Sequence, residues 1–214
     1  MRITSLERRP RRRTLDLYVD DELALTLSRD ICVTFDLRAG EEISAERLTT
    51  VREAEAKHIA MKSALRLLAY TPRSEHELRD RLGKKGIAVE VRDATIRRLR
   101  EVGLVNDAEY ARSFVESRNR TSPRGRRLVA AELRSKGVDV KLAEESASAL
   151  NDADAAYRAA ARRAQSLSKL DHQSFRRRLG NFLLQRGFDF ETSSQTVARL
   201  WAEAHSGAPN GASD

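Results

Sequence analysis

One pattern, Leu-x-x-(Lys/Arg)-Gly-apolar-x-apolar, occurs three times in this chain and constrains its fold more than any other feature. It occupies residues 82–89, 133–140 and 183–190, so its glycines lie 51 and 50 residues apart. A period of this length is typical of proteins in which each repeat is one small helical unit stacked on its neighbours. The sequence therefore predicts an internal repeat rather than a single irregular domain.

Apolar residues also keep a constant distance from each glycine. They stand eight and four positions before it and ten and thirteen after it: Leu78, Leu82, Ile96 and Leu99; Val129, Leu133, Ala147 and Leu150; Leu179, Leu183, Val197 and Leu200. Spacings of three and four place each pair on one face of a helix. A glycine after Lys or Arg is typical of a helix C-terminus, because glycine adopts the left-handed conformation without steric penalty. We expect the apolar-x-apolar pair to pin the turn that follows.

A further amphipathic helix precedes each of these helix pairs. Capping signals support the helix starts, as in Ser74 with Glu77 and Asn106 with Glu109. The fold class predicted is mainly α, with tandem three-helix repeats at 57–105, 106–151 and 152–204. A unit of this size buries too little surface alone, so we expect the three to stack into an elongated, curved array.

The first 56 residues differ from the repeats. Alternating apolar residues at 14–19 and 23–27 flank Asp20-Asp21, which predicts a β-hairpin, and residues 3–8 could add a third strand. Residues 28–37 are expected to form a short helix, and Ser44 to begin a helix that runs into the first repeat. The sequence thus predicts a small N-terminal β/α extension over residues 1–56. Residues 205–214 are expected to form a disordered tail.

The charge of the chain is unevenly distributed. The net charge of +8 divides into −2 for residues 1–56 and +10 for residues 57–214. A basic body indicates a polyanionic partner. Cys32 is the only cysteine, which fits a reducing cytoplasm. No segment has the length and apolar character of a membrane span, so we expect no membrane contact.

No arrangement of residues in the sequence predicts catalysis. The four histidines are scattered, with no metal-ligand spacing, and no phosphate-binding loop or nucleophile motif is found. We therefore expect a non-enzymatic protein with no catalytic residue, metal or cofactor.

Basic side chains gather on the predicted middle helix of each repeat and around its ends. They are Arg73, Arg79, Arg81, Lys84 and Lys85 in the first repeat, Arg118, Arg120, Arg124, Arg126, Arg127, Arg134 and Lys136 in the second, and Arg176, Arg177, Arg178 and Arg186 in the third. Stacked repeats align equivalent positions, so these cations are predicted to form a stripe that binds phosphates or carboxylates.

The repeat residues resemble the RecX family. The matching segments are 64–68, 73–78 and 82–86 in the first repeat, 106–111 with Gly125 and 132–137 in the second, and 182–188 in the third. Each motif is short, but their order and spacing together are specific, and the resemblance covers residues 57–204. The β-containing extension at 1–56 is a departure, because the shortest members lack it.

The resemblance implies a partner and an activity. RecX proteins are tandem three-helix repeat proteins that bind RecA and insert along its nucleoprotein filament. They inhibit filament extension, ATP hydrolysis, strand exchange and coprotease activity. By this resemblance the basic positions above would contact RecA or the RecA–single-stranded DNA filament, with direct DNA contact left open, and we expect a monomer.

Two alternatives stay open from the residues alone. The first is a helical DNA-binding protein that acts directly on DNA, since each helix–glycine–turn–helix unit could be interpreted as a helix-turn-helix. Three equal copies argue against it, because that motif usually docks as one copy per subunit. The second is a scaffold that binds acidic proteins only. The salt dependence of binding separates these possibilities, because pure phosphate binding loses affinity steeply as the salt concentration rises.

Overall fold

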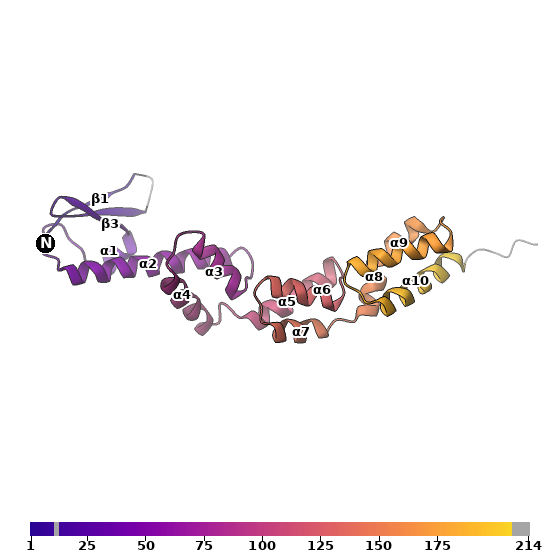
Figure 1. Cartoon of the computed structure of the whole chain (residues 1–214). Helices are drawn as coiled ribbons and strands as arrows, with labels where there is room; N and C mark the ends of the chain where they lie inside the picture. The colour runs from indigo at the N-terminus through magenta and orange to yellow at the C-terminus, as the bar shows by residue number, and fades with distance from the viewer. Residues whose placement is uncertain (11–12, 207–214) are drawn as a thin grey trace, which may run out of the picture. The chain divides into compact units, whose positions relative to one another are not determined.

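The computed structural model describes residues 1–10 and 13–206 as three strands followed by ten helices (Figure 1). The elements are β1 (Ile3–Arg8), β2 (Thr14–Val19), β3 (Glu22–Ser28), α1 (Arg29–Thr34), α2 (Ala45–Leu68), α3 (Glu75–Gly83), α4 (Val89–Glu101), α5 (Asp107–Thr121), α6 (Arg126–Ser135), α7 (Val140–Ser148), α8 (Asp152–Leu167), α9 (His172–Gln185) and α10 (Phe190–His205). The tail was expected from residue 205, but α10 includes His205, and residues 207–214 lie outside the described residues.

The chain divides into two compact units. The first comprises Met1–Pro72 and Leu78–Leu104, and the second comprises Arg73–Glu77 and the residues from Val105 onward. The first unit therefore holds the sheet, α1, α2, most of α3, and α4. The second holds α5 to α10 together with the short segment before and within the first turn of α3.

The strands form one antiparallel sheet in the order β1-β2-β3. Asp20 and Asp21, with φ of 49° and 67°, make the tight turn between β2 and β3. Positive φ at both central residues is the geometry of a type I′ hairpin turn, which aspartate tolerates better than most residues. The predicted hairpin and third strand are thereby confirmed. Leu17 and Leu27 are fully buried and form the core of this sheet.

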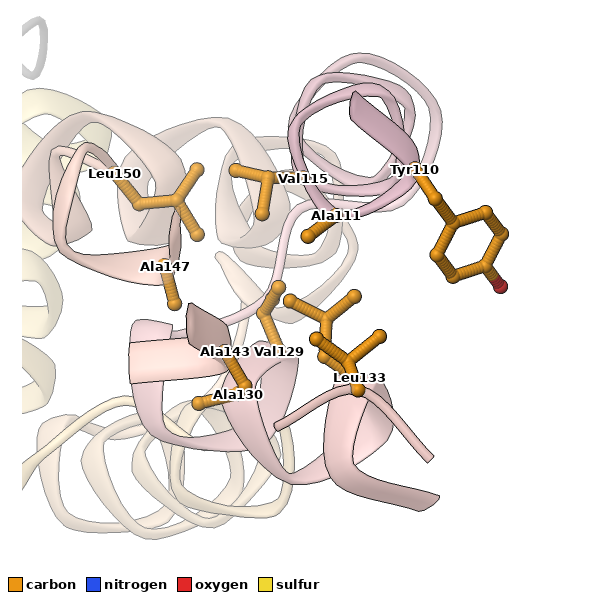
Figure 2. Packing of buried hydrophobic residues seen from close by; sticks show 10 residues of the cluster. Tyr110, Ala111, Val115, Val129, Ala130, Leu133, Ala143, Ala147 and Leu150 are labelled. Atoms are coloured by element: carbon orange, nitrogen blue, oxygen red, sulfur yellow. The ribbon is translucent and has the colours of Figure 1, made fainter. Parts of the chain in front are cut away.

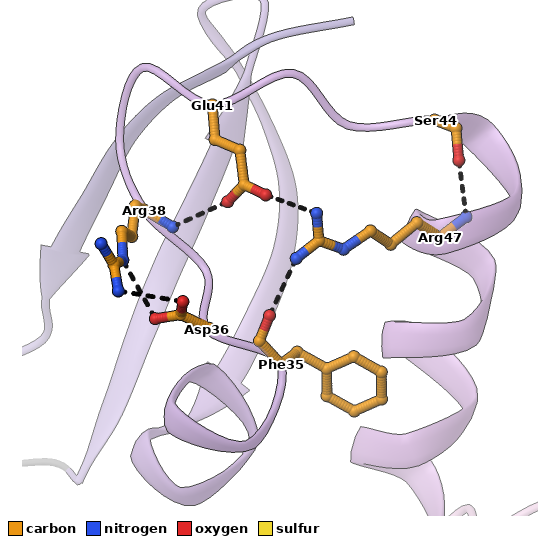
Figure 3. Close-up of polar contacts among 6 residues, drawn as sticks. All are labelled: Phe35, Asp36, Arg38, Glu41, Ser44 and Arg47. Carbon is orange, nitrogen blue, oxygen red and sulfur yellow. Dashed lines mark hydrogen bonds and ion pairs between the residues drawn. The ribbon is translucent and has the colours of Figure 1, made fainter.

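The connection from α1 to α2 is held by the polar contacts drawn in Figure 3. Helix α1 ends at Thr34, earlier than expected, and Asp36 then has a φ of +47°. Arg47, in the first turn of α2, forms an ion pair with Glu41 and donates to the Phe35 carbonyl at 2.9 Å. Ser44 caps α2 by accepting from the Arg47 amide at 3.1 Å. These contacts fix the loop 35–44 against the start of α2.

Helix α2 runs without interruption for 24 residues from the N-terminal extension into the first repeat, as predicted. Its buried Glu55 accepts hydrogen bonds from the amide and hydroxyl of Ser28, at 2.9 and 2.7 Å. A buried carboxylate is tolerated when hydrogen bonds satisfy it. This contact ties the end of β3 to the middle of α2.

The apolar columns found in the sequence form the repeat cores. All twelve of their residues are at most 5% exposed. In the second repeat, Val129 and Leu133 of α6 point toward Ala111 and Val115 of α5, as Figure 2 shows, and Ala130 belongs to the same buried cluster. Helix propensity alone would not hold such short helices in water, so this shared burial supplies their stability.

The three glycines end their helices as predicted. Gly86, Gly137 and Gly187 have φ of 76°, 78° and 84°. In each repeat, the amide after the glycine donates to the carbonyl four residues before the glycine, at 3.1 to 3.3 Å. This 6→1 bond is that of a Schellman motif, so the repeated sequence pattern encodes a repeated helix stop.

The expectation that both apolar residues after the glycine pin the turn is wrong for the second of them. Val89, Val140 and Phe190 are 52%, 54% and 70% exposed. Each is the first residue of its helix, namely α4, α7 and α10, and its side chain extends into solvent. Only the residue directly after the glycine packs inward, as Val138 and Phe188 do at 3% exposure.

Within the second unit, each glycine turn lies against the start of an earlier middle helix. The Ser74 hydroxyl donates to the Lys136 carbonyl at 2.6 Å, and the Gly125 amide donates to the Arg186 carbonyl at 2.9 Å. A side chain on Gly125 would collide with the Gly187 backbone. The Gly187 turn therefore joins the second and third repeats through close backbone contact, which explains why glycine stands at position 125.

Candidate functional site

Four arginines meet where the second and third repeats join within the second unit. They are Arg118 of α5, Arg124 of the α5–α6 loop, Arg163 of α8 and Arg186 at the end of α9, and we call them the arginine junction. Arg118 Nε lies 2.7 Å from one oxygen of Glu132, and Arg124 forms an ion pair with the other. Burial, together with the charges of Arg118 and Arg186, lowers the pKa of Arg124.

Aromatic rings hold three of the four guanidinium groups of the arginine junction in place. Arg118 lies over the Phe114 ring at 5.0 Å, while Arg163 and Arg186 lie over the Phe182 ring at 4.8 and 4.7 Å. Such stacking leaves the edge of each guanidinium, with its N–H groups, able to bind other acceptors. Glu132 is the one carboxylate ion-paired with these arginines in the described residues. The excess of positive charge favours an external anion.

A groove of about 900 Å³ lies between α6, α7 and the α9–α10 turn. Its basic lining residues are Arg126, Arg127 and Arg134, and its exposed apolar residues include Leu184 and Phe190 at 45% and 70% exposure. Two of these arginines have counter-ions. Arg126 Nε lies 3.1 Å from the buried carboxylate of Asp152, and Arg134 lies 3.5 Å from Glu144.

The structure separates fifteen of the sixteen predicted basic residues into two kinds. Six form ion pairs with carboxylates, and Arg186 instead donates to the Pro123 carbonyl at 3.1 Å. The six are Arg79 with Asp93, Arg118 and Arg124 with Glu132, Arg126 with Asp152, Arg134 with Glu144, and Lys136 with Glu77. These side chains have a structural role that competes with any external ligand.

The other kind is exposed and has no ion pair in the described residues. It comprises Arg81, Lys84, Lys85, Arg120, Arg127, Arg176, Arg177 and Arg178. Arg73 belongs to neither kind: it is half-buried, and its Nε has no hydrogen-bond partner among the described residues. Exposed cations without counter-ions can bind an anion without first losing an internal contact, so they are the stronger candidates for binding.

Three residues of the candidate site were not identified from the sequence. Arg163 lies on the first helix of the third repeat, away from the middle helices and their ends, where the basic clusters were expected. Glu132 and Asp152 are the internal counter-ions, and a carboxylate on a basic helix gives no signal of its partner. The Arg162-Arg163 doublet was the one available signal for Arg163.

The described residues contain no group of three or more His, Cys, Asp or Glu side chains placed to hold a metal ion. Among the same residues, no helix combines the length and the apolar character needed to cross a membrane.

The fold and the arginine junction define a tandem three-helix repeat protein with a cationic surface. Three family models match it in order: the first, second and third three-helix domains of RecX, at residues 60–99, 106–146 and 151–197. This chain belongs to the RecX family, whose named members are regulatory proteins.

Individual relatives agree with that assignment. The chain is 27% identical to Regulatory protein RecX of Bacillus licheniformis, over 91% of this chain and 75% of that protein. It is 30% identical to Regulatory protein RecX of Levilactobacillus brevis, over 92% of this chain and 76% of that protein. A crystal structure of regulatory protein RecX has the same fold, with a TM-score of 0.69, 19% identity, and coverage of 92% and 98% of the two chains.

Proposed function

We propose that this chain binds the RecA–single-stranded DNA filament and inhibits its extension, ATP hydrolysis, strand exchange and coprotease activity. The observation that carries the proposal is the arginine junction. There, Arg118 and Arg124 share the one internal carboxylate of Glu132, and Arg163 and Arg186 of the next repeat stack on Phe182 without a carboxylate partner in the described residues. A groove with exposed Arg127 and Phe190 lies in the same unit. Family membership supplies the regulatory role.

The proposal depends on charge and repetition rather than on chemistry at a single site. Arginine forks bind phosphate or carboxylate oxygens in pairs, so they suit both the DNA and the acidic side chains of a nucleoprotein filament. Repeated units present these forks at several points along one partner. The chain would act in the cytoplasm as a monomer, without a metal or cofactor.

The test is single-stranded-DNA-stimulated ATP hydrolysis by RecA of the same organism, titrated with this protein. We expect inhibition at amounts well below one molecule per RecA subunit, because blocking extension at filament ends needs few molecules. Inhibition that needs saturation of the DNA, and that excess DNA relieves, would instead support the alternative, a helical protein that competes for DNA directly. No inhibition at any ratio contradicts the proposal.

The matched variants come from the two kinds of cation. Arg127→Ala removes an exposed arginine that has no ion pair in the described part of the chain. Arg112→Ala on α5 removes an exposed arginine outside the groove and the arginine junction. Both lower the net charge equally. We expect Arg127→Ala to weaken inhibition and Arg112→Ala to leave it unchanged.

A further inference from the structure

The N-terminal extension carries a basic cleft of its own in the first unit. The cleft has a volume of about 640 Å³ and lies at the base of the β1–β2 connection, the start of α1 and the middle of α2. Its charged lining residues are Arg8, Arg9, Arg13, Arg29, Asp30 and Lys62. Five cations thus face one carboxylate.

This gathering of cations stands against the charge of the segment that contains it. Residues 1–56 hold 10 Lys and Arg and 12 Asp and Glu. Four of those basic residues line the cleft, but only one of the acidic residues does. Like charges repel unless an external anion offsets them, so a segregated cluster indicates a binding surface rather than a solvated face. Arg11 and Arg12 lie outside the described residues.

Most of these cations are available for a ligand. Arg9 is the exception, because its Nε forms an ion pair with Asp16 at 2.7 Å. Arg8, Arg13, Arg29 and Lys62 are exposed, and none forms an ion pair within the described residues. Thr14 also lines the cleft, and its buried hydroxyl oxygen has no hydrogen-bond partner in the described part of the chain. An unsatisfied hydroxyl beside four free cations can donate to a ligand oxygen.

We propose that this cleft binds the phosphate backbone of single-stranded DNA, independently of its sequence. The volume suits one or two nucleotide phosphates with their sugars, since ligand pockets of this size hold molecules of that class. Arginine forks match phosphate oxygens. Pro10 and Leu15 are its apolar lining residues and it has no aromatic ring, so it offers no platform for base stacking. Contacts to the backbone alone carry no sequence information.

This inference rests on the proposed function, because the DNA that the cleft would contact is the strand inside the RecA filament. Apart from Lys62, the residues that line the cleft lie outside the three matched family domains. The N-terminal extension would hold DNA while the repeats contact RecA.

The experiment measures binding of the full chain to a fluorescein-labelled oligothymidine by anisotropy, without RecA, over a range of salt concentrations. The test variant is Arg29→Ala with Lys62→Ala. The control variant is Arg52→Ala with Lys57→Ala, which removes two cations from α2 outside the cleft, where Arg52 is exposed and Lys57 forms only a 4.0 Å surface pair. Circular dichroism checks that both variants keep the helicity of the parent.

The expected result follows from counterion release. A plot of log affinity against log salt concentration falls with a slope of about −0.7 for each phosphate contact to a single strand. Losing two contacts should therefore make the slope less steep by about 1.4. At 0.1 M salt this corresponds to roughly 25-fold weaker binding. The control variant should keep the parent's slope and affinity.

Equal slopes for the test and control variants overturn the proposal, and so does a parent chain that does not bind the oligonucleotide. Strong preference for one base composition over another overturns backbone binding as the mode. RecA ATP hydrolysis, measured in parallel, separates this inference from the proposed function. A parent chain that inhibits RecA but does not bind the oligonucleotide contradicts the cleft alone, and a parent chain that binds DNA without any RecA inhibition contradicts the proposed function alone.

Discussion

The backbone contact between the second and third repeats should make Gly125→Ala strongly destabilising, although alanine fits the backbone of Gly125. Gly125 has φ of −66° and ψ of 148°, which any residue adopts, so conformational strain is not the reason. The added methyl carbon would lie 2.7 Å from the Phe188 amide nitrogen and closer still to the Gly187 carbonyl. The two backbones must therefore separate.

The magnitude follows from two losses. Inserting a methyl group into a closely packed contact destabilises by about 1–3 kcal/mol. Separation also breaks the 2.9 Å hydrogen bond from the Gly125 amide to the Arg186 carbonyl, which contributes about 1 kcal/mol. We expect the free energy of unfolding to fall by about 2–4 kcal/mol.

Urea unfolding followed by circular dichroism and by fluorescence of Trp201 measures this change. Trp201 is the one tryptophan of the chain and packs against Phe175 in the third repeat, so it reports on the joined repeats. Gly180→Ala in α9 is the matched control, because nothing lies within 4 Å of its added carbon. Alanine should stabilise that helix by about 1 kcal/mol. If Gly125→Ala unfolds at the same urea concentration as the parent, the joined backbones do not hold the repeats together.

Three further predictions concern charge and exposure. Burial favours a raised pKa for Glu77, but its lysine and tyrosine partners outweigh that effect and hold the pKa below 4.5. The contribution of the Glu77 carboxylate to stability should be complete above pH 4.5 and disappear as the pH falls through the lowered pKa. Glu77→Gln should flatten that part of a curve of unfolding free energy against pH, and an unchanged curve would refute the assignment. Arg124→Glu should lower the midpoint of thermal unfolding, because the new carboxylate would face Glu132. Arg127→Glu should leave that midpoint unchanged and weaken RecA inhibition. A larger loss of thermal stability for Arg127→Glu than for Arg124→Glu would disprove the division of the cations into two kinds. Leu183→Ala should destabilise by about 2–5 kcal/mol and Phe190→Ala by less than about 0.5 kcal/mol in urea unfolding, and comparable losses would show that Phe190 is not exposed in solution.

The repeat was predictable because its signals are local. Apolar spacing of three and four, and a glycine after a cation, each specify a helix face or a helix end within a few residues. The buried columns ending in Leu99, Leu150 and Leu200, and the left-handed glycines, follow from those signals. The tight turn at Asp20-Asp21 is of the same local kind.

Exposure of the second apolar residue after each glycine could not be predicted the same way. Val140 and Val138 have the same chemical character in the sequence, but one begins α7 and the other packs beneath the turn. Two alternating apolar residues indicate a strand or turn with one buried face, and here the helix starts between them. The side-chain direction therefore depends on a helix boundary, which is the least local feature of the pattern.

The candidate site was predictable in composition but not in pairing. A basic middle helix is visible in the sequence, whereas the contact of Arg126 with Asp152, 26 residues away, depends on how the repeats stack. The basic cleft of the N-terminal extension was missed for a related reason. The net charge of residues 1–56 is −2, and this sum does not show that several of their cations lie together on one surface.

The proposal that this chain stops RecA filaments from growing can be tested by measuring the growth of single filaments. Labelled RecA assembling on single DNA molecules gives the extension rate of each filament by fluorescence microscopy. We expect this protein, far below the RecA concentration, to halt extension of existing filaments, and Arg127→Glu to need higher concentrations to do so. Extension at an unchanged rate with the protein in excess would contradict it.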